Sequence, residues 1–286
     1  MNKVLILEKA GFFYVNVEKK QGLTTLSGFE KYGFEERPLF ERKGTELLID
    51  CEYLTQLLNL LEKKQKDKNR EINIVLPYAM TWYYTLDVED VPKNRNELYD
   101  FVMWKIGKII PIPKEQIEMR VDVISRLKEQ TTLLIAIAFK TFIIDLEKCL
   151  KESGFIAPII MPPSIAILNV LEPYLTEDCT IVWLKEKGFS MMIYIDGLPK
   201  YIRELDQTLS VERLDSEIFS FLSTVGKNEN IKTPERLLYF DELGREGIKN
   251  FLPEKSISVS LSELKIQENV KHNMINKYII AAGAVS

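Results

Sequence analysis

The order strand, strand, strand, helix, strand occurs twice in this sequence of 286 residues. In the first copy, at about 3–77, the tight turn Glu8–Gly11 joins two apolar runs, and a helix with leucines at helical spacing follows at 51–65. The second copy, at about 179–240, has unrelated residues but the same predicted order: strands at 179–185, 188–195 and 199–205, a helix at 210–224, and the strand "RLLYF". Because the topology repeats and the sequence does not, we expect two halves of similar design.

Residues 78–152 separate the two halves and have a pattern of their own. "TWYYTLDV" predicts a strand, 95–108 a helix, and "IPIP" at 110–113 a rigid elbow; two further strands and a helix that ends at Gly154 complete a β-α-β-β-α module. Duplicated β-β-β-α-β halves around a cleft are the layout of the actin-like (ribonuclease H-like) α/β fold. We therefore expect a first half at 1–77, an inserted module at 78–152 and a second half at 153–286, whose C-terminal helix returns to the first half.

Charge and cysteine content exclude several classes of protein. The 38 basic and 42 acidic residues give a net charge of −4 without a basic stripe, which argues against a nucleic-acid partner. Cys51, Cys149 and Cys179 are odd in number and far apart, so we expect buried, reduced cysteines in a cytoplasmic protein and neither a disulfide framework nor a zinc site. A single histidine, His272, excludes catalytic triads and metal sites built on several histidines.

Residues 153–171 contain no charge, and their number is close to the ~20 residues that a membrane helix needs. Pro158, Pro162 and Pro163 interrupt this stretch, and proline breaks the hydrogen bonds of a helix interior. We therefore expect a buried strand, a turn and a helix that begins near Ser164, and no direct insertion into a membrane.

The most specific motif is a helix that runs into an I-P-x-P elbow, at "MWKIGKIIPIPKEQIEMRVDVI". Together with "VLPYAMTWYYTLDV", "LLIAIAFKTFIIDLEKCLKESGFIAPII", "IVWLKEKGFSMMIYIDGLPKYIREL" and the final "YIIAAGAVS", this motif resembles the PilM family of type IV pilus assembly proteins. The resemblance covers about residues 70–205 and the C-terminus. The cytoplasmic domain of the type II secretion protein GspL is a close relative of that family.

The resemblance implies an actin-like fold and a cytoplasmic protein that is peripheral at the inner membrane through its partners. Members of this family bind the short cytoplasmic N-terminal peptide of a membrane protein, PilN, and couple the pilus platform to motor ATPases. Many members bind ATP. Self-association is a further expectation for a scaffold of this kind.

The nucleotide-binding turns of the family are altered in this chain. The first turn of the family resembles D-x-G-S-S, but Glu8, Lys9, Ala10 and Gly11 stand here, followed by Phe12. The second turn reads Leu184-Lys-Glu186-Lys187-Gly188, without the Asp that organises a metal, and "YFDELG", ending at Gly244, replaces the Gly-Gly of the adenosine site. We therefore expect no enzyme activity, no cofactor and no metal; the alternative is that Lys9, Lys185 and Lys187 hold the phosphates of ATP with Mg.

The family's partner peptide lies in a groove between the first half and the inserted module. The aromatic and apolar candidates there are Trp82, Tyr83, Tyr84, Trp104, Ile110 and Pro111. The alternative is that most of these side chains form the core of the module.

Three functions follow from these observations. The first is a scaffold that binds a PilN-like membrane protein and does not hydrolyse ATP. The second is a PilM-like protein whose ATP occupancy tunes partner binding, or a GspL-like component of type II secretion. The third is an actin-like or sugar-kinase-like enzyme with rewired catalytic residues.

Overall fold

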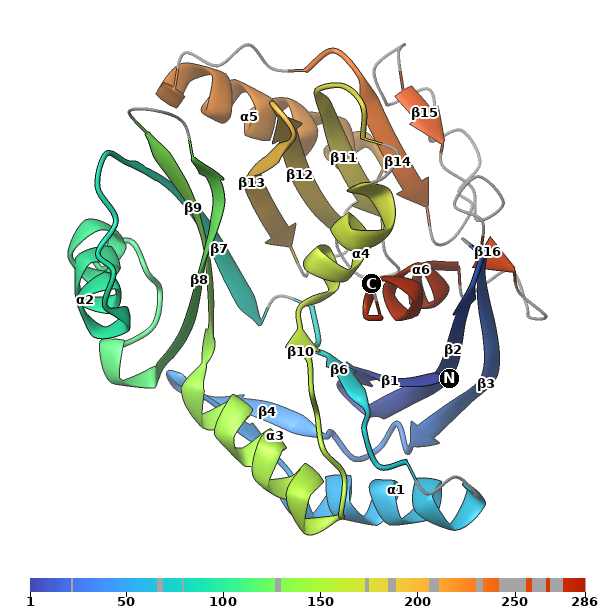
Figure 1. Cartoon of the computed structure of the whole chain (residues 1–286). Coiled ribbons are helices and arrows are strands. Elements are labelled where there is room, and N and C mark those ends of the chain that lie inside the picture. The colour runs from blue at the N-terminus through green and yellow to red at the C-terminus, as the bar shows by residue number, and fades with distance from the viewer. Residues whose placement is uncertain are drawn as a thin grey trace. The chain divides into compact units, whose positions relative to one another are not determined.

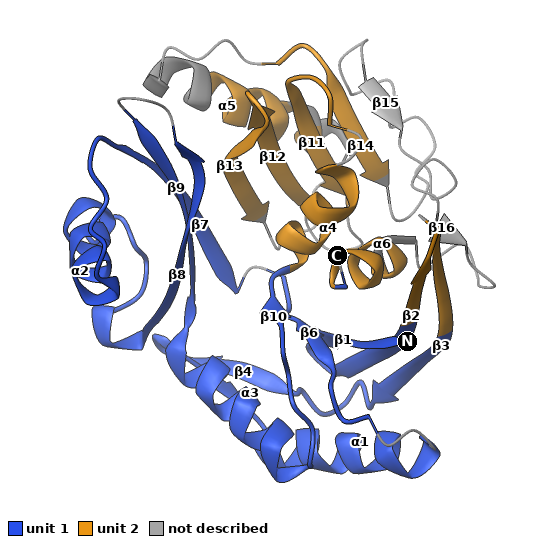
Figure 2. Cartoon of the chain, viewed as in Figure 1, with its two compact units in different colours: residues 1–16, 28–162, 285 blue, residues 17–27, 163–284, 286 orange. Residues whose placement is uncertain are grey.

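The computed structural model forms two compact units, coloured separately in Figure 2: residues 1–16, 28–162 and 285, and residues 17–27 and 163–284. It describes residues 1–285 except 22, 66–68, 79, 127–129, 173–174, 185–188, 206–210, 230–233, 242–255, 259–265 and 268–274. His272 lies outside the described residues, and so does the helix expected from "DELGREGIKNFL" at 241–252 except for its first residue, Asp241.

The first three strands of the chain belong to a six-stranded sheet with the order β10-β6-β1-β2-β3-β16 (Figure 1). The register of its parallel pairs places Val4 opposite Asn73 and Ile74 opposite Ile160, while β16 pairs with the end of β3 that belongs to the second unit. Its strands are β1 (Asn2–Glu8), β2 (Gly11–Lys20), β3 (Leu23–Gly33), β6 (Asn73–Val75), β10 (Ile160–Met161) and β16 (Ile266–Gln267).

Two helices and a short hairpin accompany this sheet. Helix α1 (Cys51–Lys64) places its leucines at i, i+3, i+4 and i+7, so Leu54, Leu57, Leu58 and Leu61 form one buried stripe. Helix α3 (Lys140–Glu152) packs beside α1 and contributes to the same core cluster. The hairpin β4 (Phe40–Lys43) and β5 (Glu46–Ile49) was not predicted, because its strands are short and half of their eight residues are charged, which leaves little apolar alternation.

The inserted module is a three-stranded antiparallel sheet, β7-β9-β8, with helix α2. Its members are β7 (Thr81–Val88), α2 (Arg95–Ile106), the 3-10 turn η1 (Lys114–Gln116), β8 (Ile117–Arg126) and β9 (Thr131–Phe139). Every second residue of β9, from Leu133 to Phe139, is buried, and Val102 and Ile106 of α2 belong to the same core cluster. With α3 (Lys140–Glu152), which follows β9, the predicted β-α-β-β-α order is present.

The second unit holds a five-stranded sheet, β13-β12-β11-β14-β15. Val182, Ile193, Leu214 and Ile218 belong to the core cluster between this sheet and α5. The elements are β11 (Cys179–Leu184), β12 (Phe189–Ile195), β13 (Leu198–Leu205), α5 (Val211–Glu229), β14 (Leu237–Asp241) and β15 (Ser256–Ser258). The predicted strands and helix of the second copy are confirmed to within a few residues.

Helices α4 (Pro163–Leu171) and α6 (Ile275–Gly283) pack against each other in the second unit. A Cβ atom on Gly283 would stand 1.6 Å from the carbonyl oxygen of Ala166, so only glycine allows the two backbones to come this close. The Asn169 side chain donates a hydrogen bond to the Gly283 carbonyl (3.0 Å). Among the described residues no helix is long and apolar enough to cross a membrane.

The expectation that all three cysteines are reduced is wrong for two of them. Helices α1 and α3 lie side by side and bring Cys51 and Cys149, which are 98 positions apart, to a Cα–Cα distance of 5.6 Å, where they form a disulfide. The odd number and wide spacing in sequence gave no sign of this pair. Cys179 is a free, buried thiol, and burial raises its pKa to about 11.

Candidate functional site

The turn between β1 and β2, Glu8–Gly11, is called the first turn below. Lys9 is exposed there, Glu8 is half-buried, and the following Phe12 and Phe13 are buried in the core. Two of its carbonyl oxygens are bonded within the first unit: Lys9 O accepts from Leu39 N (2.5 Å) and Ala10 O accepts from the Tyr53 hydroxyl (3.4 Å). The positions where the family has hydroxyls therefore offer none, and the exposed charged side chain of this turn is a lysine.

Gly11 lies directly against Gly33 at the end of β3. A Cβ atom on Gly11 would stand 2.0 Å from the Tyr32 carbonyl oxygen, and one on Gly33 would stand 2.0 Å from the Ala10 carbonyl oxygen. Both φ angles are positive, at 153° and 132°. The first turn is therefore held to β3 by a backbone contact that no other residue type fits.

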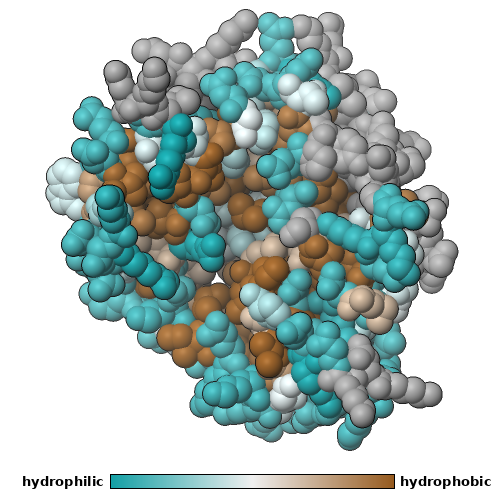
Figure 3. Space-filling view, viewed as in Figure 1, coloured by the Kyte–Doolittle hydropathy of each residue, from teal (hydrophilic) through white to brown (hydrophobic). Residues whose placement is uncertain are grey.

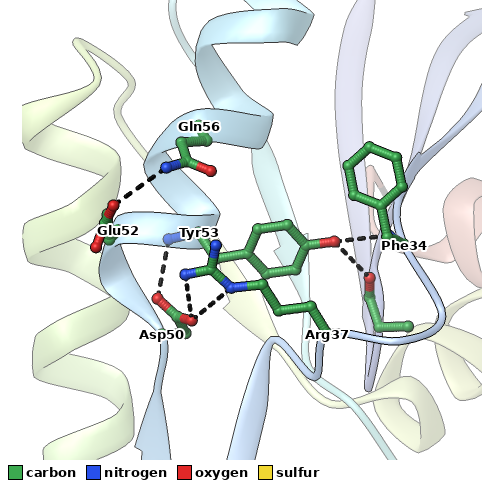
Figure 4. Close-up of polar contacts among 7 residues, drawn as sticks. Phe34, Arg37, Asp50, Glu52, Tyr53 and Gln56 are labelled. Carbon is green, nitrogen blue, oxygen red and sulfur yellow. Dashed lines mark hydrogen bonds and ion pairs between the residues drawn. The ribbon is translucent and has the colours of Figure 1, made fainter.

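Tyr53 connects the first turn to the start of α1 (Figure 4). Its hydroxyl accepts a hydrogen bond from Phe34 N (2.6 Å) and donates the bond to Ala10 O, while the Arg37 guanidinium lies 4.6 Å from the centre of its ring. We call Ala10, Phe34, Arg37, Asp50 and Tyr53 the Tyr53 cluster. Sequence reasoning missed it, because its members come from three separate segments of the chain.

Asp50 closes the Tyr53 cluster by capping α1. The carboxylate oxygen Oδ1 accepts from Tyr53 N (2.9 Å), and Oδ2 accepts from Nη2 (2.7 Å) and Nε (3.0 Å) of Arg37. Partial burial by itself would raise the pKa of Asp50, but the bond from Tyr53 N and the Arg37 charge outweigh it and lower the pKa below its ordinary value.

The other expected nucleotide residues cannot be placed. Glu186, Lys187 and Gly188 of the second turn, with Lys185, and Gly244 of the adenosine site lie outside the described residues. Within the described part of the chain, no group of three or more His, Cys, Asp or Glu side chains could hold a metal ion.

The six candidate partner residues do not form one surface. In the module sheet Trp82 is opposite Ile137 and Tyr84 is opposite Ile135, so these two aromatics share the face of the sheet that packs on the core. The Trp82 ring meets the Phe139 ring edge to face at 5.2 Å. Tyr83 points to the opposite face and is half-buried.

Tyr84 also joins the sheet to the elbow that follows α2. Its hydroxyl donates to the Ile109 carbonyl oxygen (3.3 Å), and burial raises its pKa. Ile110 is half-buried against the core cluster. For Trp82, Tyr84 and Ile110 the alternative reading as module core is therefore the one that their packing favours.

The remaining two candidates, Trp104 and Pro111, are exposed and belong to a surface at the end of α2. Trp104 is 73% exposed and Ile109 63% exposed, and Pro111 is exposed beside them in the sequence. The Lys105 ammonium lies 4.8 Å from the centre of the Trp104 ring, and Lys108 is exposed as well. We call Trp104, Lys105, Lys108, Ile109 and Pro111 the α2–elbow surface. This surface combines apolar side chains with positive charge. On the face shown in Figure 3, hydrophobic residues are likewise exposed among hydrophilic ones.

A polar cavity of about 230 Å³ lies between the first sheet and the end of α1 and was not predicted. Two of its charged groups are paired, since Glu30 accepts from Lys64 at 2.7 Å and also from the Tyr32 hydroxyl at 2.7 Å. The Lys3 ammonium donates to the Asn69 carbonyl oxygen. Tyr14 and Asn16, also in its lining, are hydrogen-bonded to each other (2.5 Å). The cavity is smaller than the roughly 300–1,000 Å³ of ordinary ligand pockets.

Comparison with known proteins gives matches in structure only. No protein-family model matches the chain, and no curated protein matches it in sequence. A chain of a structure described as a PilM–PilN type IV pilus biogenesis complex matches with a TM-score of 0.72 and 16% identity, over 99% of this chain and 97% of that one.

Two other solved structures match nearly the whole chain. The cytoplasmic domain of EpsL, an inner-membrane component of the type II secretion system of Vibrio cholerae, has a TM-score of 0.56 and 12% identity, over 99% of this chain and 94% of that one. A Bacteroides thetaiotaomicron protein described as having an actin-like ATPase fold has a TM-score of 0.52 and 9% identity, over 98% and 95%.

The chain has an actin-like fold. The resemblance to PilM that the sequence indicated is therefore confirmed at the level of the fold, and the cytoplasmic domain of EpsL shares this fold.

Proposed function

We propose that the chain is a scaffold of a type IV pilus platform, or of a related secretion platform, that binds the cytoplasmic N-terminal segment of a PilN-like membrane protein and does not hydrolyse ATP. The observation that supports this most is the match over 99% of the chain to a structure described as a PilM–PilN complex. In this role the protein is cytoplasmic and peripheral at the inner membrane through its partner; motor ATPases and further copies of the chain are additional candidate contacts.

The α2–elbow surface is the proposed docking site for the partner segment. Large exposed aromatic side chains are frequent binding hot spots, and Trp104 is the most exposed large apolar side chain among the described residues. Lys105 and Lys108 would attract acidic side chains of a bound segment. Trp82 and Tyr84 would stabilise this surface indirectly, because they pack against the same core cluster as the buried residues of α2.

Substitution of Trp104 tests the docking site. Trp104→Ala is expected to weaken binding of a synthetic peptide, with the N-terminal sequence of the PilN-like protein from the same genome, by about tenfold, which is ~1.4 kcal/mol. Isothermal titration calorimetry measures the affinity, and circular dichroism checks the fold. Phe219→Ala is the matched control, since Phe219 on α5 is 71% exposed and lies in the other unit. Equal affinities for wild type and both variants would contradict the assignment.

Lys9 favours a second candidate function, in which ATP occupancy tunes partner binding. Its ammonium is the exposed charge of the first turn, where a phosphate would approach. The scaffold proposal expects no change in the thermal unfolding midpoint with Mg-ATP. Saturating nucleotide at 100 times its Kd would stabilise the fold by about 2.7 kcal/mol, so an increase of several degrees that is lost in Lys9→Ala would favour the second candidate.

A further inference from the structure

The pair Cys51–Cys149 joins two parts of the chain that are distant in sequence. Cys51 is the first residue of α1, in the predicted first half, and Cys149 lies near the end of α3, in the inserted module. Their Cα–Cα distance of 5.6 Å is typical of disulfides, and the bond closes a loop over 98 positions. The disulfide therefore fastens a helix of the module to a helix of the first half, within one compact unit.

The two sulfur atoms have different surroundings. Cys149 is fully buried, whereas Cys51 is half-buried and stands at the N-terminus of α1, next to the capping residue Asp50. The free N–H groups of a helix N-terminus stabilise a thiolate, and a partly exposed thiolate is the form that reacts. The nearby Asp50 carboxylate opposes this effect, but its charge is offset by its ion pair with Arg37. Cys51 is therefore the more accessible residue of the two, and the fully buried Cys149 is placed to react with Cys51.

We propose that Cys51 and Cys149 form a thiol–disulfide exchange site that is oxidised by low-molecular-weight disulfides, such as oxidised glutathione, and reduced by small thiols. The Cys51 thiolate attacks one sulfur of the small disulfide, which forms a mixed disulfide and releases one small thiol. The Cys149 thiolate then attacks the Cys51 sulfur and releases the second small thiol. The two protein thiols lose two electrons and two protons in total, and both small thiols carry them away.

Oxidation at this site fixes α3 to α1. Because the closed loop is long, the bond removes many conformations from the unfolded chain and stabilises the folded one. The third cysteine, Cys179, is a buried thiol in the other unit and provides an internal control.

The test uses the whole chain, reduced, desalted and then equilibrated under native conditions in mixtures of oxidised and reduced glutathione. Thiols are trapped with iodoacetamide in denaturant and counted by intact mass. We expect three trapped thiols in the reduced protein and one, at Cys179, in the oxidised protein. The thermal unfolding midpoint of the oxidised form is expected to be higher by roughly 5–10 °C. Cys179→Ala is expected to keep both effects, and Cys51→Ser to lose them.

Three results would overturn the proposal. The first is a native chain that keeps all three thiols in mixtures that oxidise the unfolded chain. The second is a mixed disulfide that persists on Cys51, which would mean that Cys149 does not reach it. The third is a Cys51–Cys149 bond that excess reduced glutathione leaves intact in the folded protein, since this would make it a permanent crosslink and not an exchange site.

Discussion

Removing one oxygen atom, in Tyr53→Phe, tests whether the Tyr53 cluster holds the first turn in place. The Tyr53 side chain is only 2% exposed, and its hydroxyl is the acceptor for Phe34 N at 2.6 Å. A buried N–H that loses its acceptor costs about 1–3 kcal/mol. The Phe34 side chain is exposed, so water can reach part of this site, and the bond to Ala10 O is long at 3.4 Å. These two facts place the expected loss at about 1–2 kcal/mol.

The free energy of unfolding, measured by urea denaturation with circular dichroism, gives this loss directly, and the thermal midpoint should fall by roughly 2–8 °C. The Arg37–Tyr53 ring contact remains in the variant, so the change isolates the hydroxyl. Tyr84→Phe is the matched control: its hydroxyl makes an exposed bond of 3.3 Å and should contribute less than about 0.5 kcal/mol. If Tyr53→Phe costs no more than Tyr84→Phe, the cluster does not support the turn.

Two further substitutions examine other contacts. The pKa of Asp50 is lowered by folding, so the contribution of its charge is present above the ordinary aspartate pKa and is lost as pH falls through the lowered value, below about pH 4. Asp50→Asn keeps a residue that caps helices well but removes the ion pair with Arg37. The difference in unfolding free energy between wild type and variant should therefore shrink as pH falls from 6 to about 3. A difference that stays constant with pH would contradict the role of the charge. Gly283→Ala introduces a Cβ atom 1.6 Å from the Ala166 carbonyl oxygen, so α6 would have to move away from α4. The thermal unfolding midpoint, measured by differential scanning calorimetry, should fall by about 2–10 °C. An unchanged midpoint would show that the two helices do not pack so closely.

Local pattern was enough to predict most elements of this fold. The leucine spacing of α1 and the alternation in β8 each report a face that meets the core, and the structure has both elements at nearly the predicted positions. The hairpin β4–β5 was missed because only Leu47 of its eight strand residues is buried, which leaves no period to detect.

The candidate site was harder to predict, because it depends on which face of an element is covered. The alternation in β7 separates Trp82 and Tyr84 from Tyr83, but nothing in the sequence says that α2 packs on the side of Trp82 and Tyr84. Trp104 is on the opposite side of its own helix from Val102 and Ile106, and this follows only once those two residues are known to be core. The Cys51–Cys149 pair likewise depends on how two helices pack, which spacing along the chain does not encode.

The contact between Gly11 and Gly33 limits which side chains the first turn can carry. The family pattern has a serine at the position of Gly11, but any side chain there would stand within 2.0 Å of the Tyr32 carbonyl oxygen. A serine at position 11 would therefore destabilise the fold, even though it would add a hydroxyl that could bind a phosphate. To accept a side chain at Gly11, the backbone at Ala10–Gly11 and the backbone at Tyr32–Gly33 would first have to move apart. The backbone contact between Gly11 and Gly33 thus keeps a hydroxyl side chain out of this position of the turn.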